Sequence, residues 1–69
     1  MLDFNAARQT IRKVGASNVR VLPMEGQNVT DGDYQIEVNE GGWKPIVAGV
    51  KKFIAEQLVN QALNRVICG

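Results

Sequence analysis

Two adjacent lysines, Lys51 and Lys52, are the residues whose placement most clearly indicates chemistry. They open the longest segment of the chain without a helix breaker. If that segment is helical, both ammonium groups stand at the positive end of the helix dipole, which costs about 0.3–1 kcal/mol per charge when no anion is bound. A phosphate held between the helix N-terminus and two ammonium groups would reverse the sign of this contribution. The pair therefore predicts a phosphate contact, with two solvated lysines as the alternative.

Three further basic residues could extend this surface. Arg8 and Arg12 stand one turn apart on a predicted helix, without an acidic neighbour at helical spacing, and Lys44 lies on the strand before the lysine pair. Like charges one turn apart on a helix repel each other. The hypothesis is that Arg8, Arg12 and Lys44 add to the basic surface if they lie on the same side. Solvated surface side chains are the alternative.

The net charge of +1 conceals a segregated distribution. Residues 1–24 carry four basic residues against one acidic residue, and residues 41–69 carry the same numbers. Residues 25–40 carry five acidic residues and no basic residue. The local distribution of charge, rather than the net charge, is therefore what bears on the choice of a partner.

Enzymatic chemistry is not indicated. The chain has no histidine, which removes the commonest general base, and its single cysteine, Cys68, has no neighbouring base. The acidic residues that could do acid–base work fall in predicted loops or on the solvent side of a predicted strand, where solvated carboxylates account for them: Asp31, Asp33, Glu37 and Glu40. The glycines match neither nucleotide-binding fingerprint. We therefore predict a protein with no catalytic residues and no cofactor.

A metal site is not expected either. Zinc is disfavoured because the chain offers no histidine and only one thiol. The run from Asp31 to Asp33 resembles part of a calcium loop. With Gly32 at the sixth position, however, Val29 and Val38 would stand where oxygen ligands are required. A turn is the better interpretation.

Two aromatic residues predict a different function, a protein interface. Phe53 projects among the polar residues of the predicted last helix, and Trp43 begins a strand predicted at a sheet edge. Large aromatic side chains exposed near a free sheet edge are typical of dimer or partner interfaces. The alternative is that Phe53 folds over the strand end as part of the core.

The last helix is predicted from Gly49 to Ile67, because the apolar residues of this segment recur at steps of three and four. They form two neighbouring rows: Val50, Ile54, Leu58, Ala62 and Val66, and beside them Ala55, Val59, Leu63 and Ile67. A start at Pro45 would suit a first helical position. In that case Ile46 and Val47 would point away from the apolar face, so the later start is preferred.

The N-terminal third predicts a helix followed by a strand. A helix over about residues 4–14 is capped by Asp3 and closed by Gly15. Its apolar stripe comprises Phe4, Ala7, Ile11 and Val14. Alternation of apolar and polar residues then predicts a strand over residues 18–23, and residues 25–33 form a polar loop.

Two further strands complete the pattern. Strict alternation predicts a strand over residues 34–39, and residues 39–42 form a hairpin connection with two glycines. A third strand over residues 43–47 contains Pro45, which has no amide hydrogen to donate and is therefore expected at a sheet edge.

This order predicts a single α+β domain over residues 1–69. It has α-β-β-β-α order, with a three-stranded antiparallel sheet and both helices packed on one face. One core is expected, from Phe4, Ile11, Val21, Ile36, Leu58, Val59 and Ala62. The chain has no charged-then-apolar leader and no apolar run of about 18 residues, so we expect a cytoplasmic protein without a membrane span.

The α-β-β-β-α order resembles that of double-stranded-RNA-binding domains, and the segment from Lys51 to Leu63 is similar to the last helix of that family. A lysine pair opens this helix and an Ala-Leu pair stands late in it, as in the family. The likeness extends over residues 34–66. The Gly-Pro-x-His element that the family carries between its first two strands is missing here, and an acidic loop stands in its place.

The resemblance implies that Lys51 and Lys52 contact phosphates across the major groove of a duplex. The sequence thus favours a small non-enzymatic protein that binds a nucleic-acid backbone through the start of its last helix. Recognition would use shape and phosphate rather than base sequence. Phe53 and Trp43 support the alternative, a protein-interaction or homodimerisation module.

Overall fold

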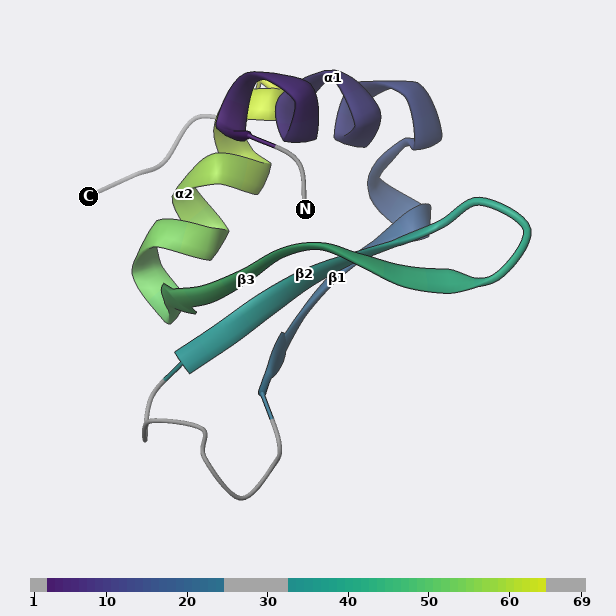
Figure 1. The fold of residues 1–69 in the computed structure, drawn as a ribbon. Coiled ribbons are helices and arrows are strands. Elements are labelled where there is room, and N and C mark those ends of the chain that lie inside the picture. The colour runs from purple at the N-terminus through teal and green to yellow at the C-terminus, as the bar shows by residue number, and fades with distance from the viewer. Residues whose placement is uncertain (1–2, 25–32, 65–69) are drawn as a thin grey trace.

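The computed structural model describes residues 3–24 and 33–64 of the 69-residue chain. Two helices flank three strands (Figure 1): α1 (Phe4–Val14), a short 3₁₀ turn η1 (Ala16–Asn18), β1 (Val19–Pro23), β2 (Asp33–Asn39), β3 (Trp43–Lys51) and α2 (Lys52–Ala62). The predicted α+β domain with α-β-β-β-α order is confirmed. The predicted loop over residues 25–33 lies outside the described residues, apart from Asp33.

The three strands form one antiparallel sheet in the order β1-β2-β3, so that β2 is central and β3 lies at an edge. The pairing of β1 with β2 is regular and places Val19 opposite Val38. β2 and β3 are joined by a tight connection in which Gly41 and Gly42 have φ values of 73° and 136°. Glycine enters this region without the steric cost that a side chain brings. The predicted hairpin and the edge position of the third strand are confirmed.

Both helices cover the same face of the sheet (Figure 1), because β2 presents one apolar face to them. Ile36 and Val38 alternate along β2 and are fully buried. They belong to a single cluster to which both helices and β3 contribute: Ala7, Ile11, Ile36, Val38, Ile46, Val47, Ala55, Leu58, Val59 and Ala62. The predicted two-layer packing therefore follows from one shared core.

Two predicted core residues are placed differently. Val21 is only partly buried against the cluster. Phe4 is 43% exposed, so its assignment to the core is wrong. Phe4 lies at the margin of the apolar stripe of α1, on the side of α2, where a hollow between the helices leaves its ring uncovered.

α1 forms as its sequence predicts. The side chain of Asp3 accepts a hydrogen bond from the backbone N–H of Ala6 at 2.8 Å and so caps the helix. Gly15, with a φ of 86°, ends it. Ala7 and Ile11, one turn apart, supply its two fully buried side chains.

The predicted boundary between the third strand and the last helix is wrong. β3 continues to Lys51 instead of ending at Val47, and α2 begins at Lys52 instead of Gly49. The pairing of β3 with the full length of β2 explains the difference. It pairs Val50 with Tyr34 and Lys51 with Asp33 in the ladder before the helix starts.

Two bulges allow β3 to reach this length. Its register against β2 shifts on either side of Ile36, so β3 carries extra residues at these two points. Gly49, with a φ of 74°, lies in one bulge, and Ile46 lies in the other. Because of the second bulge, the consecutive residues Ile46 and Val47 are both buried.

α2 also ends earlier than the predicted Ile67. Its last residue is Ala62, and Asn64 has a φ of 60°, a left-handed conformation that asparagine tolerates better than most residues. The Nε of Arg12 donates a hydrogen bond to the carbonyl oxygen of Ala62 at 2.9 Å, which satisfies one of the acceptors that a helix end leaves without a partner. The predicted helical residues 65–67 lie outside the described part of the chain.

Replacement of Leu58 by alanine should lower the free energy of unfolding by about 2–5 kcal/mol, because this side chain is almost fully buried and its removal leaves a cavity. A domain of this size has only about 3–5 kcal/mol of stability. Leu58→Ala should therefore be largely unfolded by far-ultraviolet circular dichroism. The exposed Gln9→Ala on α1 is the matched control and should melt like the wild type. A melting curve of Leu58→Ala that matches the control would contradict this core.

Candidate functional site

The start of α2 carries the predicted lysine pair. Lys51 is the last residue of β3 and the N-cap of α2, and Lys52 is the first helical residue. No side chain donates or accepts a capping hydrogen bond here, and the first turn contains no acidic residue. α1, by contrast, is capped by Asp3. The first-turn N–H groups of α2 are therefore left without a side-chain acceptor.

Each lysine of the pair has an acidic neighbour. The Nζ of Lys51 lies 3.6 Å from the carboxylate of Asp33, its cross-strand partner on β2. The Nζ of Lys52 lies 3.8 Å from the carboxylate of Glu56, one turn further along α2. Exposed ion pairs of this kind contribute about 0–1 kcal/mol, so an anion could displace them. They nevertheless partly neutralise the positive field on which phosphate binding would depend.

The two arginines lie at the opposite end of α2. The Nε of Arg8 donates to the side-chain oxygen of Gln61 at 3.3 Å, and the Nε of Arg12 donates to the Ala62 carbonyl. An 11-residue helix is about 16 Å long, which separates both guanidinium groups from the lysines at its start. Both arginines thus tie α1 to the C-terminal turn of α2.

Arg8 and Lys52 also face different sides of α2. At 3.6 residues per turn, Lys52 and Gln61, the partner of Arg8, are about half a turn apart around the helix. Lys52 lies on the flank of Glu56, whereas Gln61 lies on the flank that meets α1. The structure therefore does not bring the arginines and the lysine pair together on one surface.

Lys44 belongs to a third group, near the β2–β3 connection. Its Nζ and that of Lys13, on α1, lie 3.6 Å and 3.3 Å from the carboxylate of Glu40. The hydrogen bond from Lys13 is the main cause that lowers the pKa of Glu40 below its usual 4.5, and the positive charge of both lysines adds to it against a smaller effect of desolvation. Lys13 therefore links α1 to the hairpin through Glu40, and Lys44 pairs with Glu40 within the hairpin.

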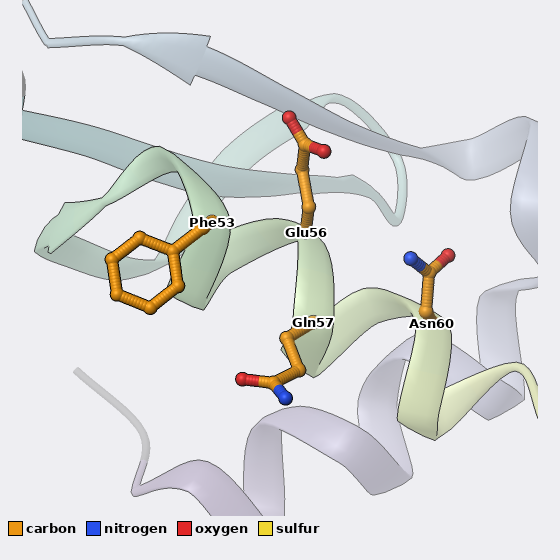
Figure 2. Close-up of a pocket in the computed structure, with 4 residues that line it drawn as sticks. All are labelled: Phe53, Glu56, Gln57 and Asn60. Carbon is orange, nitrogen blue, oxygen red and sulfur yellow. The ribbon is translucent and has the colours of Figure 1, made fainter. Parts of the chain in front are cut away.

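Phe53 stands on the outside of α2. Its side chain is 68% exposed, so the alternative in which it folds into the core is wrong. The ring borders a shallow hollow that is also lined by Glu56, Gln57 and Asn60. Figure 2 shows Glu56 and Asn60 on one side of α2 and Gln57 on the other, with the ring of Phe53 at the N-terminal end of the row.

A second hollow continues this surface onto α1. It is lined by Phe4, Arg8, Ile54, Gln57, Leu58 and Gln61, and it shares Gln57 with the first hollow. We call the surface formed by Phe4, Phe53, Ile54 and Gln57 the aromatic face.

Phe4 was missed as a surface residue because its spacing from Ala7 fits the core stripe. The position of Phe4 in the first helical turn, directly after the cap, was the signal that could have marked it.

Trp43 lies away from this face. It begins β3, whereas Phe53 follows the end of that strand, so the two aromatic residues stand at opposite ends of a nine-residue strand. The guanidinium of Arg20 lies 4.2 Å from the centre of the Trp43 ring and also pairs with Glu37 at 2.7 Å. This cation–π contact covers part of the indole, and sequence periodicity gave no sign of it.

Among residues 3–24 and 33–64, no group of three or more histidine, cysteine or acidic side chains is placed to hold a metal ion. Neither of the two 11-residue helices in these segments is long and apolar enough to cross a membrane. The chain matches no protein-family model, no curated protein and no solved structure in comparisons with known proteins.

The Glu40 contacts predict a specific response to acid. Since the pKa of Glu40 is lower in the folded state than its usual 4.5, its ionised form favours the folded state above that pH, and this stabilisation is lost as the pH falls through the lowered value. Glu40→Gln should therefore flatten the fall in stability as the pH drops below 4.5. Urea unfolding across this range measures the effect, and Lys13→Met with Lys44→Met should flatten it similarly. Parallel losses in wild type and Glu40→Gln would show that these contacts contribute nothing.

Proposed function

We propose that this chain is a non-enzymatic protein-binding module that contacts its partner through the aromatic face. The observation that carries the proposal is the 68% exposure of Phe53. Burial of a phenylalanine side chain is worth about 1.5–3 kcal/mol, and the isolated chain leaves most of this gain unused. A partner that covers the ring would recover it.

The surroundings of Phe53 support an interface rather than a chance exposure. Phe4 is 43% exposed beyond Gln57, so two aromatic side chains flank one continuous surface. The rim is polar and has few charges: Arg8, Glu56, Asn60 and Gln61. A patch of apolar side chains with a polar rim is typical of protein-interaction sites.

The proposal is tested by placing a photo-cross-linking phenylalanine analogue at position 53 in cells that produce the chain. A discrete protein adduct should form there, because the analogue keeps the shape of the side chain at the proposed contact. The same analogue at position 43 is the matched control, since Trp43 is also aromatic and 39% exposed but lies at the other end of β3.

Binding of the purified adduct partner should then weaken at least about tenfold in Phe53→Ser, as expected for an aromatic anchor. Fluorescence anisotropy with the purified proteins gives this ratio. An adduct from position 43 alone would show that the interface lies at the sheet edge and not on the aromatic face. The absence of any adduct from position 53, or an unchanged affinity, would end the proposal.

A second candidate function is binding of a nucleic-acid backbone at the start of α2. It is favoured by the lysine pair beside first-turn N–H groups that no side chain caps. The shared α-β-β-β-α order with double-stranded-RNA-binding domains supports it as well. The acidic neighbours Asp33 and Glu56, and the distance to Arg8 and Arg12, place it second.

This candidate predicts weak binding of duplex RNA or DNA that depends steeply on salt. Two phosphate contacts should give a slope of about −2 in a plot of log K against log salt concentration. Lys51→Ala with Lys52→Ala should abolish binding at low salt, while Lys44→Ala, the control outside the start of α2, should leave it intact. Electrophoretic mobility shifts provide both measurements. No shift of wild type at low salt would eliminate the candidate.

A further inference from the structure

Two arginines of α1 carry positive charge that no carboxylate in the described part of the chain neutralises. Within residues 3–24 and 33–64, every lysine and Arg20 form an ion pair with an acidic side chain, whereas Arg8 and Arg12 form none. The two arginines stand one turn apart on α1, and like charges at this spacing repel each other. An anionic group bound between them would remove this repulsion.

The end of α2 compensates only part of this charge. Arg12 donates a hydrogen bond to the carbonyl oxygen of Ala62 at 2.9 Å. Arg8 donates to the side-chain oxygens of Asn5 at 2.9 Å and of Gln61 at 3.3 Å, and both of these groups are neutral amides. A helix C-terminus carries about −0.5 elementary charge, against two full positive charges on the guanidinium groups. The contacts therefore orient the arginines without neutralising them.

An apolar hollow lies directly beside Arg8. It is the hollow between α1 and α2, and Phe4, Ile54 and Leu58 line it together with Arg8. Its volume is about 130 Å³. An engineered protein cavity of about 150 Å³ holds a benzene molecule, so this hollow has room for one apolar side chain. An uncovered apolar hollow and an unneutralised guanidinium thus lie side by side.

From this juxtaposition we infer that the partner of the aromatic face presents an acidic peptide segment, in which a bulky apolar residue stands near an aspartate or a glutamate. The inference rests on the proposed function and names the chemistry of the partner. The apolar side chain fills the hollow, and the carboxylate accepts hydrogen bonds from Arg8 and, one turn further along α1, from Arg12. Hydrogen bonds between ionised groups are roughly twice as strong as those between neutral groups.

The length of the hollow sets the spacing of the two peptide residues. It extends from Ile54 to Gln61, which is about 10 Å along the axis of α2. An extended peptide advances about 3.3 Å per residue, so about three residues cover this length. Glu56 points to the other side of α2 from Gln57 (Figure 2) and pairs there with Lys52, so its carboxylate does not face the bound segment.

Selection from a phage-displayed library of random dodecapeptides tests the inference without assuming a sequence. The wild type should enrich peptides in which an acidic residue stands within about three positions of a bulky apolar residue. The same selection with Arg8→Gln and Arg12→Gln combined should lose this enrichment. Enriched peptides that lack acidic residues, or no enriched peptide at all, would overturn the inference.

A double-mutant cycle with one enriched peptide separates recognition of the carboxylate from a structural role of Arg8. In fluorescence anisotropy, replacing the acidic residue of the peptide by its amide should weaken binding to the wild type about tenfold, because a charge-assisted hydrogen bond is lost. The same replacement should have little effect on binding to Arg8→Gln, in which the guanidinium is already absent. An equal loss in both proteins would contradict the inference.

Lys13→Gln is the matched control for this cycle. It also removes one positive charge from α1, but its partner is Glu40 on the hairpin, so it should keep the full tenfold effect of the peptide change. Circular dichroism of each variant establishes that it is folded. A loss of the effect in Lys13→Gln as large as in Arg8→Gln would reduce the contact to general charge attraction and overturn the assignment of Arg8.

Competition with duplex RNA distinguishes a phosphate ligand. The RNA should not displace the bound peptide, because the lysine pair lies at the other end of α2. RNA that displaces the peptide and binds Arg8→Gln more weakly than the wild type would assign the arginines to phosphate and overturn the inference. If position 53 forms an adduct but the selection yields no acidic peptide, the inference fails and the proposed function stands. If neither gives a product, both fail.

Discussion

The burial of one stripe of α2 on the centre of the sheet is the contact on which the rest of the structure depends. The stripe comprises Ala55, Leu58, Val59 and Ala62, and it packs in one cluster with Ile36 and Val38 of β2. A helix with a single buried stripe has no freedom of rotation left, so the residues opposite must face solvent. Turning α2 by half a turn would cover Phe53 only by burying Glu56 and Gln57, and an unpaired buried carboxylate costs more than the ring would gain. The exposed phenylalanine is thus a consequence of the core.

The length of β3 is the second constraint, and it decides how the basic residues are used. Two bulges let β3 pair with β2 as far as Lys51, which removes that residue from the helix and sets it opposite Asp33. Lys52 is left as the only lysine inside α2, with Glu56 one turn away. The ladder that stabilises the sheet therefore gives Lys51 a carboxylate partner, and Glu56 gives Lys52 another within the helix. This is the physical reason that the start of α2 carries less positive field than the sequence spacing implied.

Sequence periodicity correctly predicted which segments form helices and strands, but it did not predict where β3 ends and α2 begins. α1 and its caps, the hairpin at Gly41 and Gly42, and the edge position of β3 follow from local rules, and each is confirmed. The start of α2 does not follow from local rules, because Val50 fits both an apolar helical face and a strand that faces the core. Only the length of β2, a partner distant in sequence, resolves this ambiguity in favour of the strand.

In the candidate site, too, some features could be predicted from the sequence and others could not. The exposure of Phe53 could be read from its phase on the helix, since the apolar residues around it already define the buried side. The separation of Arg8 and Arg12 from the lysine pair could not be predicted from the sequence, because it depends on how α1 crosses α2. That crossing is fixed by tertiary packing and by the hydrogen bonds of both arginines to the end of α2. Local spacing assigns a residue to a face of its own element, and contacts between elements decide which faces meet.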